Sequence, residues 1–271
     1  MNVTKAIIPV AGWGTRRLPI TKTIEKCMLP IGNRPLVDYV VQDCLKAGIT
    51  ELIFVVGEDS TQLEDYYRSN IKLNDYLRQN GKEDKLALVA PLDGVKLHFI
   101  VQPTSYGKYG TAVPVALASQ YVNDDESVVV LMGDDFIWNN DGSSEVQRLI
   151  DSTPEGECGL IAVKVSREDV SRYGVIVINE NDYYERVVEK PAVEDAPSDL
   201  INPSKYLLTK HALEFAKTVD PDPSSGEYYI IDAINTYVQQ GGKVKVHQAV
   251  GEYLDGGSVD GWLAANNKIV S

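Results

Sequence analysis

Short apolar runs alternate with helical patterns along the first part of the chain. Residues 5–10 and 52–56 are apolar runs of the kind that forms buried strands. Between them, residues 36–48 carry apolar side chains at helical spacing and end at Gly48, a helix stop. A strand, a helix and a strand with short connections form a βαβ unit, which predicts a parallel sheet with crossover helices.

The pattern continues to about residue 165 and then changes. The further elements predicted up to that point are strands at 97–101, 127–132 and 160–165, a helix at 111–120, and a polar helical insertion over 60–90. Residues 173–191 instead alternate in short steps, which is typical of antiparallel ribbons. The last predicted elements are a helix at 228–240, a strand at 242–248 and a helix at 261–270.

These elements predict an α/β protein with a Rossmann-like three-layer fold. The central sheet is expected to be mixed but mostly parallel, with a small antiparallel part attached. A chain of 271 residues can form one large domain of this kind, so we expect a single domain over residues 1–271. The change of pattern divides it into halves of about 1–165 and 166–271.

The composition of the chain limits the classes of binding partner and the cellular compartment that we expect. The net charge of −13 argues against nucleic acid or an anionic membrane, because both need a basic face. The three cysteines are widely spaced and form no Cys-x-x-Cys pair, which disfavours a disulfide framework or a zinc site and favours a reducing cytoplasm. The N-terminus carries no secretory pattern, and no apolar run is long enough for a membrane helix.

A basic loop follows the first strand of this acidic chain. Residues 11–34 contain five basic residues and one acidic residue: Arg16, Arg17, Lys22, Lys26 and Arg34, against Glu25. Backbone N–H groups beside Gly12 and Gly14 can approach an anion closely, and basic side chains can neutralise it. The loop therefore suits a nucleoside triphosphate, although a solvated surface loop would have the same composition.

Two familiar phosphate motifs do not fit this loop. The dinucleotide pattern Gly-x-Gly-x-x-Gly needs a small third residue, but position 17 is Arg. The pattern Gly-x-x-x-x-Gly-Lys-Ser/Thr is absent as well. The sequence therefore disfavours nicotinamide chemistry and a P-loop.

Carboxylates follow two apolar segments later in the chain. Asp134 and Asp135 come after Gly133 at the carboxyl end of a predicted strand, the edge where open α/β sheets bind ligands. Asp255 follows a short apolar stretch and precedes two glycines. Such carboxylates suit Mg²⁺, which prefers oxygen ligands, but turns also favour Asp, and spacing alone does not bring Asp134 and Asp255 together.

The alternating segment ends in Glu189-Lys190-Pro191. Its Glu could accept sugar hydroxyls and its Lys could hold a phosphate, whereas a surface ion pair in a turn is the simpler alternative. Gly174, near the start of the segment, indicates either a close backbone approach or a strand kink.

Together these motifs resemble the sugar-1-phosphate nucleotidylyltransferases over nearly the whole chain, and most closely the bacterial UTP–glucose-1-phosphate uridylyltransferases. The resemblance is carried by Ala11-Gly-Trp-Gly-Thr-Arg-Arg-Leu-Pro19, Thr21-Lys22, Lys26-Cys-Met-Leu-Pro30 and Pro35-Leu-Val-Asp-Tyr-Val-Val41. It implies a glycosyltransferase-A-like nucleotidyltransferase fold, with residues 1–165 as the nucleotide-binding half and residues 166–271 as the sugar-binding half with the C-terminal helix.

The resemblance also implies roles for individual residues. The implied nucleotide-binding residues are Ala11, Gly12, Gly14, Thr15, Arg16, Lys26, Gln102, Gly107 and Asp134. The implied contacts to the sugar phosphate are Gly174, Glu189 and Lys190, and the implied Mg²⁺ ligands are Asp134 and Asp255. The residues implied to act directly in the reaction are Arg16, Lys26, Asp134 and Lys190.

The activity implied is uridylyl transfer from UTP to glucose 1-phosphate, giving UDP-glucose and pyrophosphate, in a cytoplasmic homodimer or homotetramer. Three alternatives stay open: a dTTP-dependent or other sugar specificity, a non-catalytic sugar-nucleotide-binding subunit, and a metal-dependent glycosyltransferase. Departures from the family pattern at Glu25, Cys27 and Ser204 bear on the choice of base and sugar.

Overall fold

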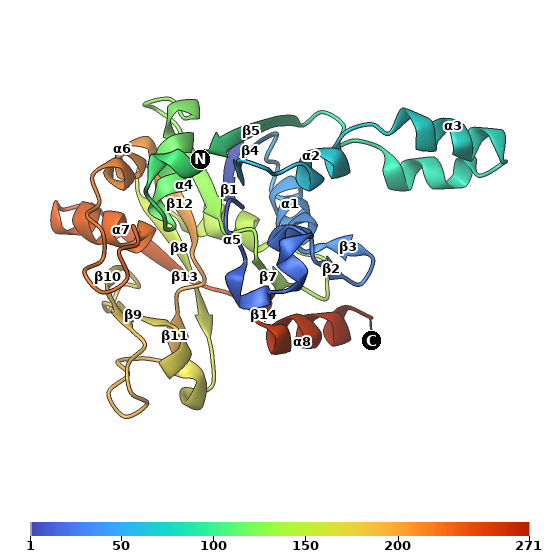
Figure 1. Ribbon diagram of the computed structural model, residues 1–271. Coiled ribbons are helices and arrows are strands. Elements are labelled where there is room, and N and C mark those ends of the chain that lie inside the picture. Colours follow the sequence, from blue (N-terminus) through green and yellow to red (C-terminus); the bar gives the residue numbers. More distant parts are fainter. Residues whose placement is uncertain (1, 271) are drawn as a thin grey trace.

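One sheet of ten strands runs through the molecule, with helices on both faces (Figure 1). The structure is a computed structural model that describes residues 2–270. The strands of this sheet are β1 (Lys5–Pro9), β4 (Glu51–Gly57), β5 (Lys96–Gln102), β6 (Ser127–Leu131), β8 (Cys158–Lys164), β9 (Gly174–Ile178), β10 (Tyr184–Glu189), β11 (Leu200–Ile201), β12 (Lys205–Thr209) and β13 (Val244–Gln248).

The sheet is mixed, as predicted. Strands β5, β4, β1 and β6 pair in parallel, in that order, and β13 pairs in parallel with β8. Strand β12 is antiparallel to both β6 and β8 and joins them. Strands β9 and β10 form the predicted antiparallel ribbon, which β11 links to β8. The Rossmann-like arrangement with an attached antiparallel part is therefore confirmed.

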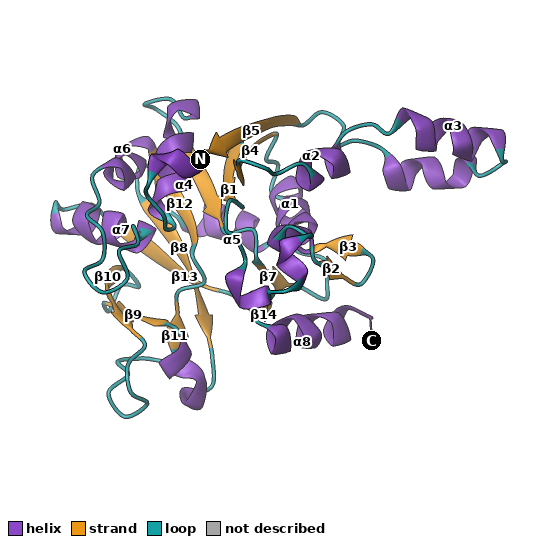
Figure 2. Cartoon of the chain, in the orientation of Figure 1, coloured by secondary structure: helices purple, strands orange, loops and turns teal. Residues whose placement is uncertain are grey.

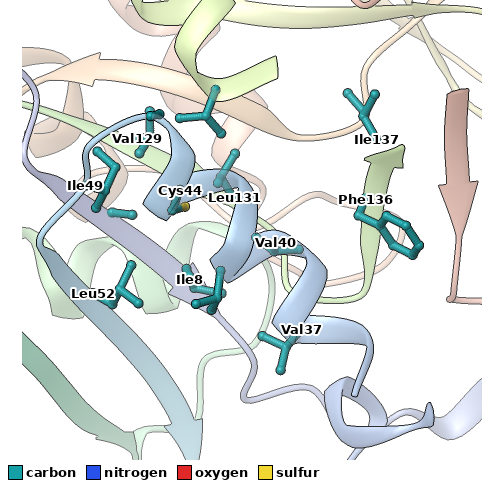
Figure 3. Close-up of a cluster of buried hydrophobic side chains, with 14 of the residues drawn as sticks. Ile8, Val37, Val40, Cys44, Ile49, Leu52, Val129, Leu131, Phe136 and Ile137 are labelled. Carbon is teal, nitrogen blue, oxygen red and sulfur yellow. The ribbon is translucent and has the colours of Figure 1, made fainter. Parts of the chain in front are cut away.

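Side chains of successive strand residues point to opposite faces of the sheet, and each face has its own helices. Ile8, Leu52 and Phe54 belong to one buried cluster, while Ile7 and Ile53 belong to the other. The first cluster packs on α1 (Leu36–Lys46), α2 (Gln62–Tyr67), α5 (Glu145–Ser152) and α8 (Val259–Val270), and Figure 3 shows its α1 side. The second packs on α4 (Ala112–Ala118), α6 (Lys210–Glu214) and α7 (Ile230–Gln239). Two buried clusters on opposite faces make the three layers.

The helices are shown in purple in Figure 2. Their bounds are α1 (Leu36–Lys46), α2 (Gln62–Tyr67), α3 (Ile71–Gln79), α4 (Ala112–Ala118), α5 (Glu145–Ser152), α6 (Lys210–Glu214), α7 (Ile230–Gln239) and α8 (Val259–Val270). Among residues 2–270, no helix has the length and apolar character that crossing a membrane requires.

The predicted insertion over 60–90 forms an arm that projects from the body of the molecule (Figure 1). It consists of α2, α3 and a 3₁₀ segment at Glu83–Val89. The arm exposes apolar side chains, with Ile71 71 % and Leu88 80 % exposed. These residues add little to the core, which is why the segment reads as polar and helical.

Several short elements were not predicted from the sequence. They include β12, α5 and a separate two-stranded sheet of β7 (Asp135–Trp138) and β14 (Glu252–Asp255). A further pair joins β2 (Pro30–Ile31) to β3 (Arg34–Pro35). Strands of two to five residues are too short for a clear apolar period, and β7 and β14, which pair with each other, are more than a hundred residues apart in the sequence.

Candidate functional site

The basic loop leaves β1 and turns back on itself. Gly14 has φ +63°, and a Cβ at this position would lie 2.9 Å from Thr21 Cγ2 and 3.0 Å from Lys26 Cβ. Glycine is required here for both its backbone conformation and its lack of a side chain. Thr21 Oγ1 donates a hydrogen bond to Gly14 O at 2.9 Å. The turn thus brings Lys26 against the start of the loop.

Two cavities adjoin this loop at the carboxyl edge of the parallel strands. One has a volume of about 250 Å³ and extends to Asp134, whereas the other, of about 480 Å³, extends toward α2. The residues that line both cavities are Val10, Ala11, Gly12, Lys26, Gln102 and Tyr109. The loop therefore forms a wall of each cavity, at the edge where this fold class binds ligands.

All nine residues implied to bind nucleotide line one or both cavities. The smaller cavity is lined by Ala11, Gly12, Gly14, Thr15, Arg16, Lys26, Gln102 and Asp134, and the larger by Gly107. Gln102 ends β5, and its Oε1 is buried without a hydrogen-bond partner among residues 2–270. A buried acceptor without a partner is costly unless a ligand supplies the donor.

Charged side chains gather at the Asp134 end. The Lys26 ammonium contacts the Asp134 carboxylate. A Cβ placed on Gly257 would lie 2.9 Å from Asp255 Oδ1, 3.3 Å from Arg16 Nη2 and 3.6 Å from Lys26 Nζ, so these three side chains surround the same small space. Burial opposes ionisation of Asp134, but Lys26, Lys205 and Arg16 together lower its pKa below the usual value. The side chain is therefore an anion, and 35 % of it is exposed to the cavity.

Asp255 is held at the beginning of α8. Its Oδ1 accepts from Gly257 N at 2.7 Å, and its Oδ2 accepts from Ser258 Oγ at 3.2 Å. Gly256 N donates to Asp134 O at 3.1 Å, and β14 pairs with β7 directly after Asp134. The structure thus places the Asp134 and Asp255 segments side by side, which sequence spacing could not show.

The two carboxylates suit a hard divalent cation. No group of three or more His, Cys, Asp or Glu side chains within residues 2–270 is arranged to enclose a metal ion. Mg²⁺ does not need such a cage, because it is usually held by one or two carboxylates together with substrate phosphates and water. Asp134 and Asp255 offer oxygen donors of this kind beside the basic loop. The donor set fits Mg²⁺, with Lys26 as the cation already paired to Asp134.

The residues implied to bind the sugar phosphate lie on the antiparallel ribbon. A Cβ on Gly174 would lie 2.9 Å from Glu189 Oε2, so the Glu189 carboxylate covers the backbone of Gly174. Lys190 is exposed and has φ +43°, which is unusual for a residue with a side chain. Among the described residues, no hydrogen bond or ion pair joins Glu189 or Lys190 to the Asp134 cluster.

The ribbon approaches the Asp134 cluster through an aromatic contact. The ring centroids of Tyr173 and Tyr253 are 6.5 Å apart, with the planes nearly perpendicular. Tyr173 precedes β9, and its carbonyl accepts a hydrogen bond from Lys190 N at 3.0 Å. Gly174 and Glu189 are thus brought together, while the Lys190 side chain stands apart.

Asp135 does not share the exposed position of Asp134. It begins β7, is buried, and pairs with Lys205 Nζ at 2.5 Å through Oδ1, while Tyr253 OH donates to its Oδ2 at 2.9 Å. Burial raises the pKa of Asp135 to about 6, against the lowering effect of Lys205. Sequence reasoning placed Asp135 with Asp134 at the ligand edge and missed Lys205. The available signal was a lysine at the start of an otherwise apolar segment, Lys205-Tyr-Leu-Leu-Thr209.

Glu25, one of the departures from the family pattern, ties the basic loop to the arm. Its Oε1 accepts from Thr61 N and Gln62 N, both at 2.9 Å, and its Oε2 accepts from Ser60 Oγ at 2.6 Å. The carboxylate thus satisfies N–H groups at the beginning of α2. Cys27, the second departure, is buried beside it, and burial raises the pKa of its thiol, so it is an unreactive thiol.

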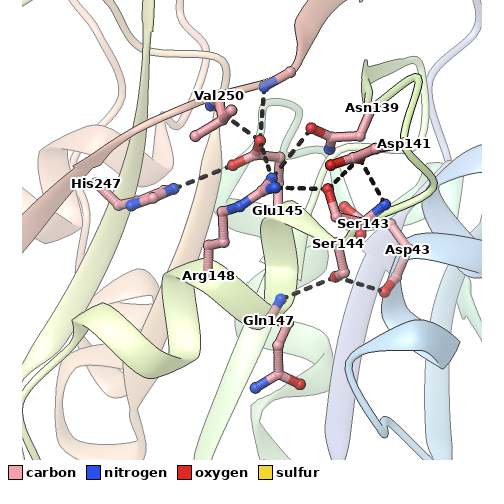
Figure 4. Close-up of polar contacts among 11 residues, drawn as sticks. Asp43, Asn139, Asp141, Ser143, Ser144, Glu145, Gln147, Arg148, His247 and Val250 are labelled. Atoms are coloured by element: carbon pink, nitrogen blue, oxygen red, sulfur yellow. Dashed lines mark hydrogen bonds and ion pairs between the residues drawn. The ribbon is translucent and has the colours of Figure 1, made fainter.

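A second charged cluster lies outside the cavities and is complete in itself (Figure 4). Glu145 Oε1 accepts from Arg148 Nη1 at 2.7 Å and from the backbone N–H groups of Val250 and Gly251 at 3.0 and 2.7 Å. His247 Nε2 lies 3.1 Å from Glu145 Oε2. The carboxylate has no free face toward a ligand, so this cluster is structural.

The fold and the site define a nucleotidyltransferase. The sequence profile of the nucleotidyl transferase family matches residues 5–271, nearly the whole chain, and the chain belongs to this family.

Relatives within the family include a protein of Streptococcus pneumoniae named UTP–glucose-1-phosphate uridylyltransferase. It is 39 % identical over 243 residues, which is 87 % of this chain and 80 % of the relative. Among solved structures, a UTP-bound UGPase from Acinetobacter baumannii superposes with a TM-score of 0.87, at 27 % identity over 99 % of this chain and 93 % of that one. A UDP-glucose pyrophosphorylase complexed with UDP-glucose superposes with a TM-score of 0.82, at 29 % identity over 99 % of each chain.

Proposed function

We propose that this protein transfers the uridylyl group of UTP to glucose 1-phosphate, forming UDP-glucose and pyrophosphate. The observation that carries the proposal is the convergence of Arg16, Lys26, Asp134 and Asp255 at the end of a cavity whose walls contain the remaining nucleotide residues. The relatives named for this activity share most of the chain, which supports the same substrates here.

The reaction needs no general base. A phosphate oxygen of glucose 1-phosphate is already anionic near neutral pH, and it attacks the α-phosphorus of UTP. The new bond joins that oxygen to the α-phosphorus, the bond from the α-phosphorus to the bridging oxygen breaks, and that oxygen leaves with pyrophosphate. Positioning and charge neutralisation therefore supply the catalysis, as in phosphoryl transfer generally.

The basic loop serves the triphosphate. Backbone N–H groups from Ala11 to Thr15 bind phosphate oxygens, and Arg16 neutralises the β- and γ-phosphates. Lys26 exchanges its contact with Asp134 for the reacting and departing phosphates, which keeps the ammonium paired throughout. Gln102 reads the edge of the base with its buried amide, and Gly107 leaves room for the base to lie flat.

Asp134 and Asp255 would hold Mg²⁺. The ion, when bound, polarises the phosphate oxygens and offsets the charge of the triphosphate. Gly174 and Glu189 contact the sugar, and Lys190 binds its phosphate. Lys190 is exposed, and the ribbon approaches the Asp134 cluster through the contact of Tyr173 with Tyr253.

The remaining alternatives are weighed by the same residues. UTP and dTTP share the edge that Gln102 reads, so a dTTP-dependent enzyme is the second candidate. A glycosyltransferase releases no pyrophosphate and has no use for the two cations of the phosphate loop, Arg16 and Lys26. A non-catalytic subunit has no use for two carboxylates beside the phosphate loop.

We also propose a single domain with halves at 1–165 and 166–271, since β12 and β13 from the second half pair with β6 and β8 of the first.

The experiment is a matrix of pyrophosphate release with UTP, dTTP, ATP and GTP against several sugar 1-phosphates, each with Mg²⁺. The proposal predicts the highest kcat/KM for UTP with glucose 1-phosphate. A higher kcat/KM for dTTP or for another sugar phosphate would overturn the assigned specificity. If a folded protein binds UDP-glucose but releases no pyrophosphate with any pair of substrates, the binding-subunit alternative is favoured instead.

A further inference from the structure

A buried ion pair lies directly behind the two proposed metal ligands. Lys205 Nζ, on β12, is 2.5 Å from Asp135 Oδ1 and 3.2 Å from Asp135 O. Tyr253 OH, on β14, donates to Asp135 Oδ2 at 2.9 Å. We call these three residues, Asp135, Lys205 and Tyr253, the Asp135 clamp. The residues Lys205 and Asp135 are only 4 % and 9 % exposed, so the clamp has little access to solvent or to a substrate.

The clamp joins strands that backbone hydrogen bonds leave separate. Strands β7 and β14 pair only with each other, whereas β12 belongs to the main sheet. Apolar contacts of Phe136 and Leu254 hold the two-stranded sheet near the core, but such contacts are not directional. The Lys205–Asp135 pair fixes the orientation of β7 on the main sheet, and the Tyr253–Asp135 bond fixes β14 on β7.

Both proposed metal ligands are attached to this clamp. Asp134 is the residue before Asp135, and Asp255 lies opposite Asp135 in the β7–β14 ladder and two residues after Tyr253. The two carboxylates come from segments about 120 residues apart in the sequence. Their separation and direction therefore depend on how β14 lies on β7.

Stability does not account for this arrangement. A buried ion pair is often no better for stability than apolar residues of the same volume, because desolvation offsets the attraction. The backbone before Lys205 is also strained, since Ser204 has φ +55°. Directional contacts such as those of the Asp135 clamp can fix the positions of two metal ligands, even where they cost some free energy of folding.

We propose that Asp135, Lys205 and Tyr253 are positioning residues that hold Asp134 and Asp255 in the arrangement needed to bind the metal–UTP complex. This inference rests on the proposed function, because it concerns the same site. None of the three side chains needs to touch a substrate.

The test compares Tyr253→Phe, the double variant Asp135→Asn/Lys205→Met, and Lys205→Arg with the unaltered protein. Tyr253→Phe removes one hydroxyl, and the double variant removes the ion pair without leaving a buried charge. Two readouts are used: the Kd of Mn²⁺ measured by electron paramagnetic resonance with UTP and no sugar phosphate, and steady-state kcat and KM. The control is Tyr184→Phe, which removes a buried hydroxyl bonded to Asn235 Oδ1 at 2.7 Å, at a residue that lines neither of the two cavities of the candidate site.

We expect Tyr253→Phe and the double variant to stay folded, to weaken Mn²⁺ binding about 10-fold and to lower kcat by about 10- to 100-fold, as is common for residues behind metal ligands. Lys205→Arg keeps the positive charge and should therefore retain most of the Mn²⁺ affinity and of kcat, and Tyr184→Phe should change neither. Unchanged Mn²⁺ affinity and kcat in folded Tyr253→Phe and double variants would overturn the clamp, whatever happens to their Tm.

The proposed function is tested separately by the unaltered protein. If it makes no UDP-glucose but binds Mn²⁺ with UTP, the proposed function is wrong, and the Mn²⁺ affinities of the variants still decide on the clamp. If the unaltered protein binds no Mn²⁺ in the presence of UTP, both proposals are wrong.

Discussion

The Glu145 cluster and the Asp134 cluster differ in how many of their charged groups have partners within the protein. In the Glu145 cluster, four donors converge on one carboxylate and occupy it (Figure 4). In the Asp134 cluster, Lys26 takes one carboxylate oxygen, Arg16 makes no hydrogen bond or ion pair within the described residues, and part of Asp134 faces a cavity. A cluster with an unpaired cation beside a cavity indicates a binding site, whereas a cluster in which every charge is paired indicates a structural contact.

The largest expected effect is on catalysis at the open cluster. Asp134→Asn keeps the size of the side chain but removes the charge that pairs with Lys26 and would hold the metal. We expect kcat to fall about 1,000-fold or more, which corresponds to about 4 kcal/mol of transition-state stabilisation. The free energy of unfolding, measured with urea, should change by less than about 1 kcal/mol because the side chain is one-third exposed.

The filled cluster should respond in the opposite way. Glu145→Gln leaves Arg148 without its counter-ion and sets an amide group against donors. We expect the free energy of unfolding to fall by about 3 kcal/mol, as is typical when a buried ion pair loses one partner. At a temperature where the variant is folded, its kcat should stay close to that of the unaltered protein. A large loss of kcat in the fully folded variant would show that the two clusters are not independent.

The pH dependence of stability provides a further comparison. Burial opposes the ionisation of Glu145, but bonds from His247 and the backbone lower its pKa below the usual 4.5. A carboxylate whose pKa is lowered by folding stabilises the fold at pH values above its pKa in the unfolded state. That contribution is lost as the pH falls through the lowered pKa of the folded state. Urea unfolding from pH 6 to pH 3 should therefore show a steeper loss in the unaltered protein than in Glu145→Gln. Equal slopes would contradict this account.

The ribbon should affect one substrate only. Lys190→Ala removes an exposed ammonium that makes no contact with the nucleotide cavities, so we expect the KM for glucose 1-phosphate to rise about 10- to 30-fold, equivalent to about 1.4–2 kcal/mol of a charge-assisted hydrogen bond. The KM for UTP should change less than about 2-fold. Initial rates over a grid of both substrates measure the two values, and equal increases in both would remove Lys190 from the sugar-phosphate site.

The smallest effect concerns backbone strain beside the clamp. Ser204 has φ +55°, a conformation that glycine adopts without steric cost. Ser204→Gly should therefore raise the free energy of unfolding by up to about 1 kcal/mol, partly offset by the greater freedom of glycine in the unfolded chain. Urea titration measures this change. A clear loss of stability would mean that the hydroxyl, and not the strain, matters at this position.

The sequence predicts most strands of the sheet, most of its helices and the antiparallel ribbon, because buried strands and amphipathic helices carry periodic apolar patterns. It also predicts the basic loop from local charge. It does not predict that Asp134 and Asp255 lie side by side, because short strands such as β7 and β14 carry no period and pair across more than a hundred residues. The role of Asp135 was missed for the same reason, since its partner Lys205 lies on another unpredicted strand.

The most direct test of the central claim follows the phosphorus atoms of UTP. The protein is incubated with Mg²⁺, glucose 1-phosphate and UTP labelled with ³²P either at the α-phosphorus or at the γ-phosphorus, and the products are separated. The account predicts the α-label in UDP-glucose and the γ-label in pyrophosphate, with both products nearly absent for folded Asp134→Asn. The α-label in UMP alone, or equal rates for Asp134→Asn and the unaltered protein, would contradict it.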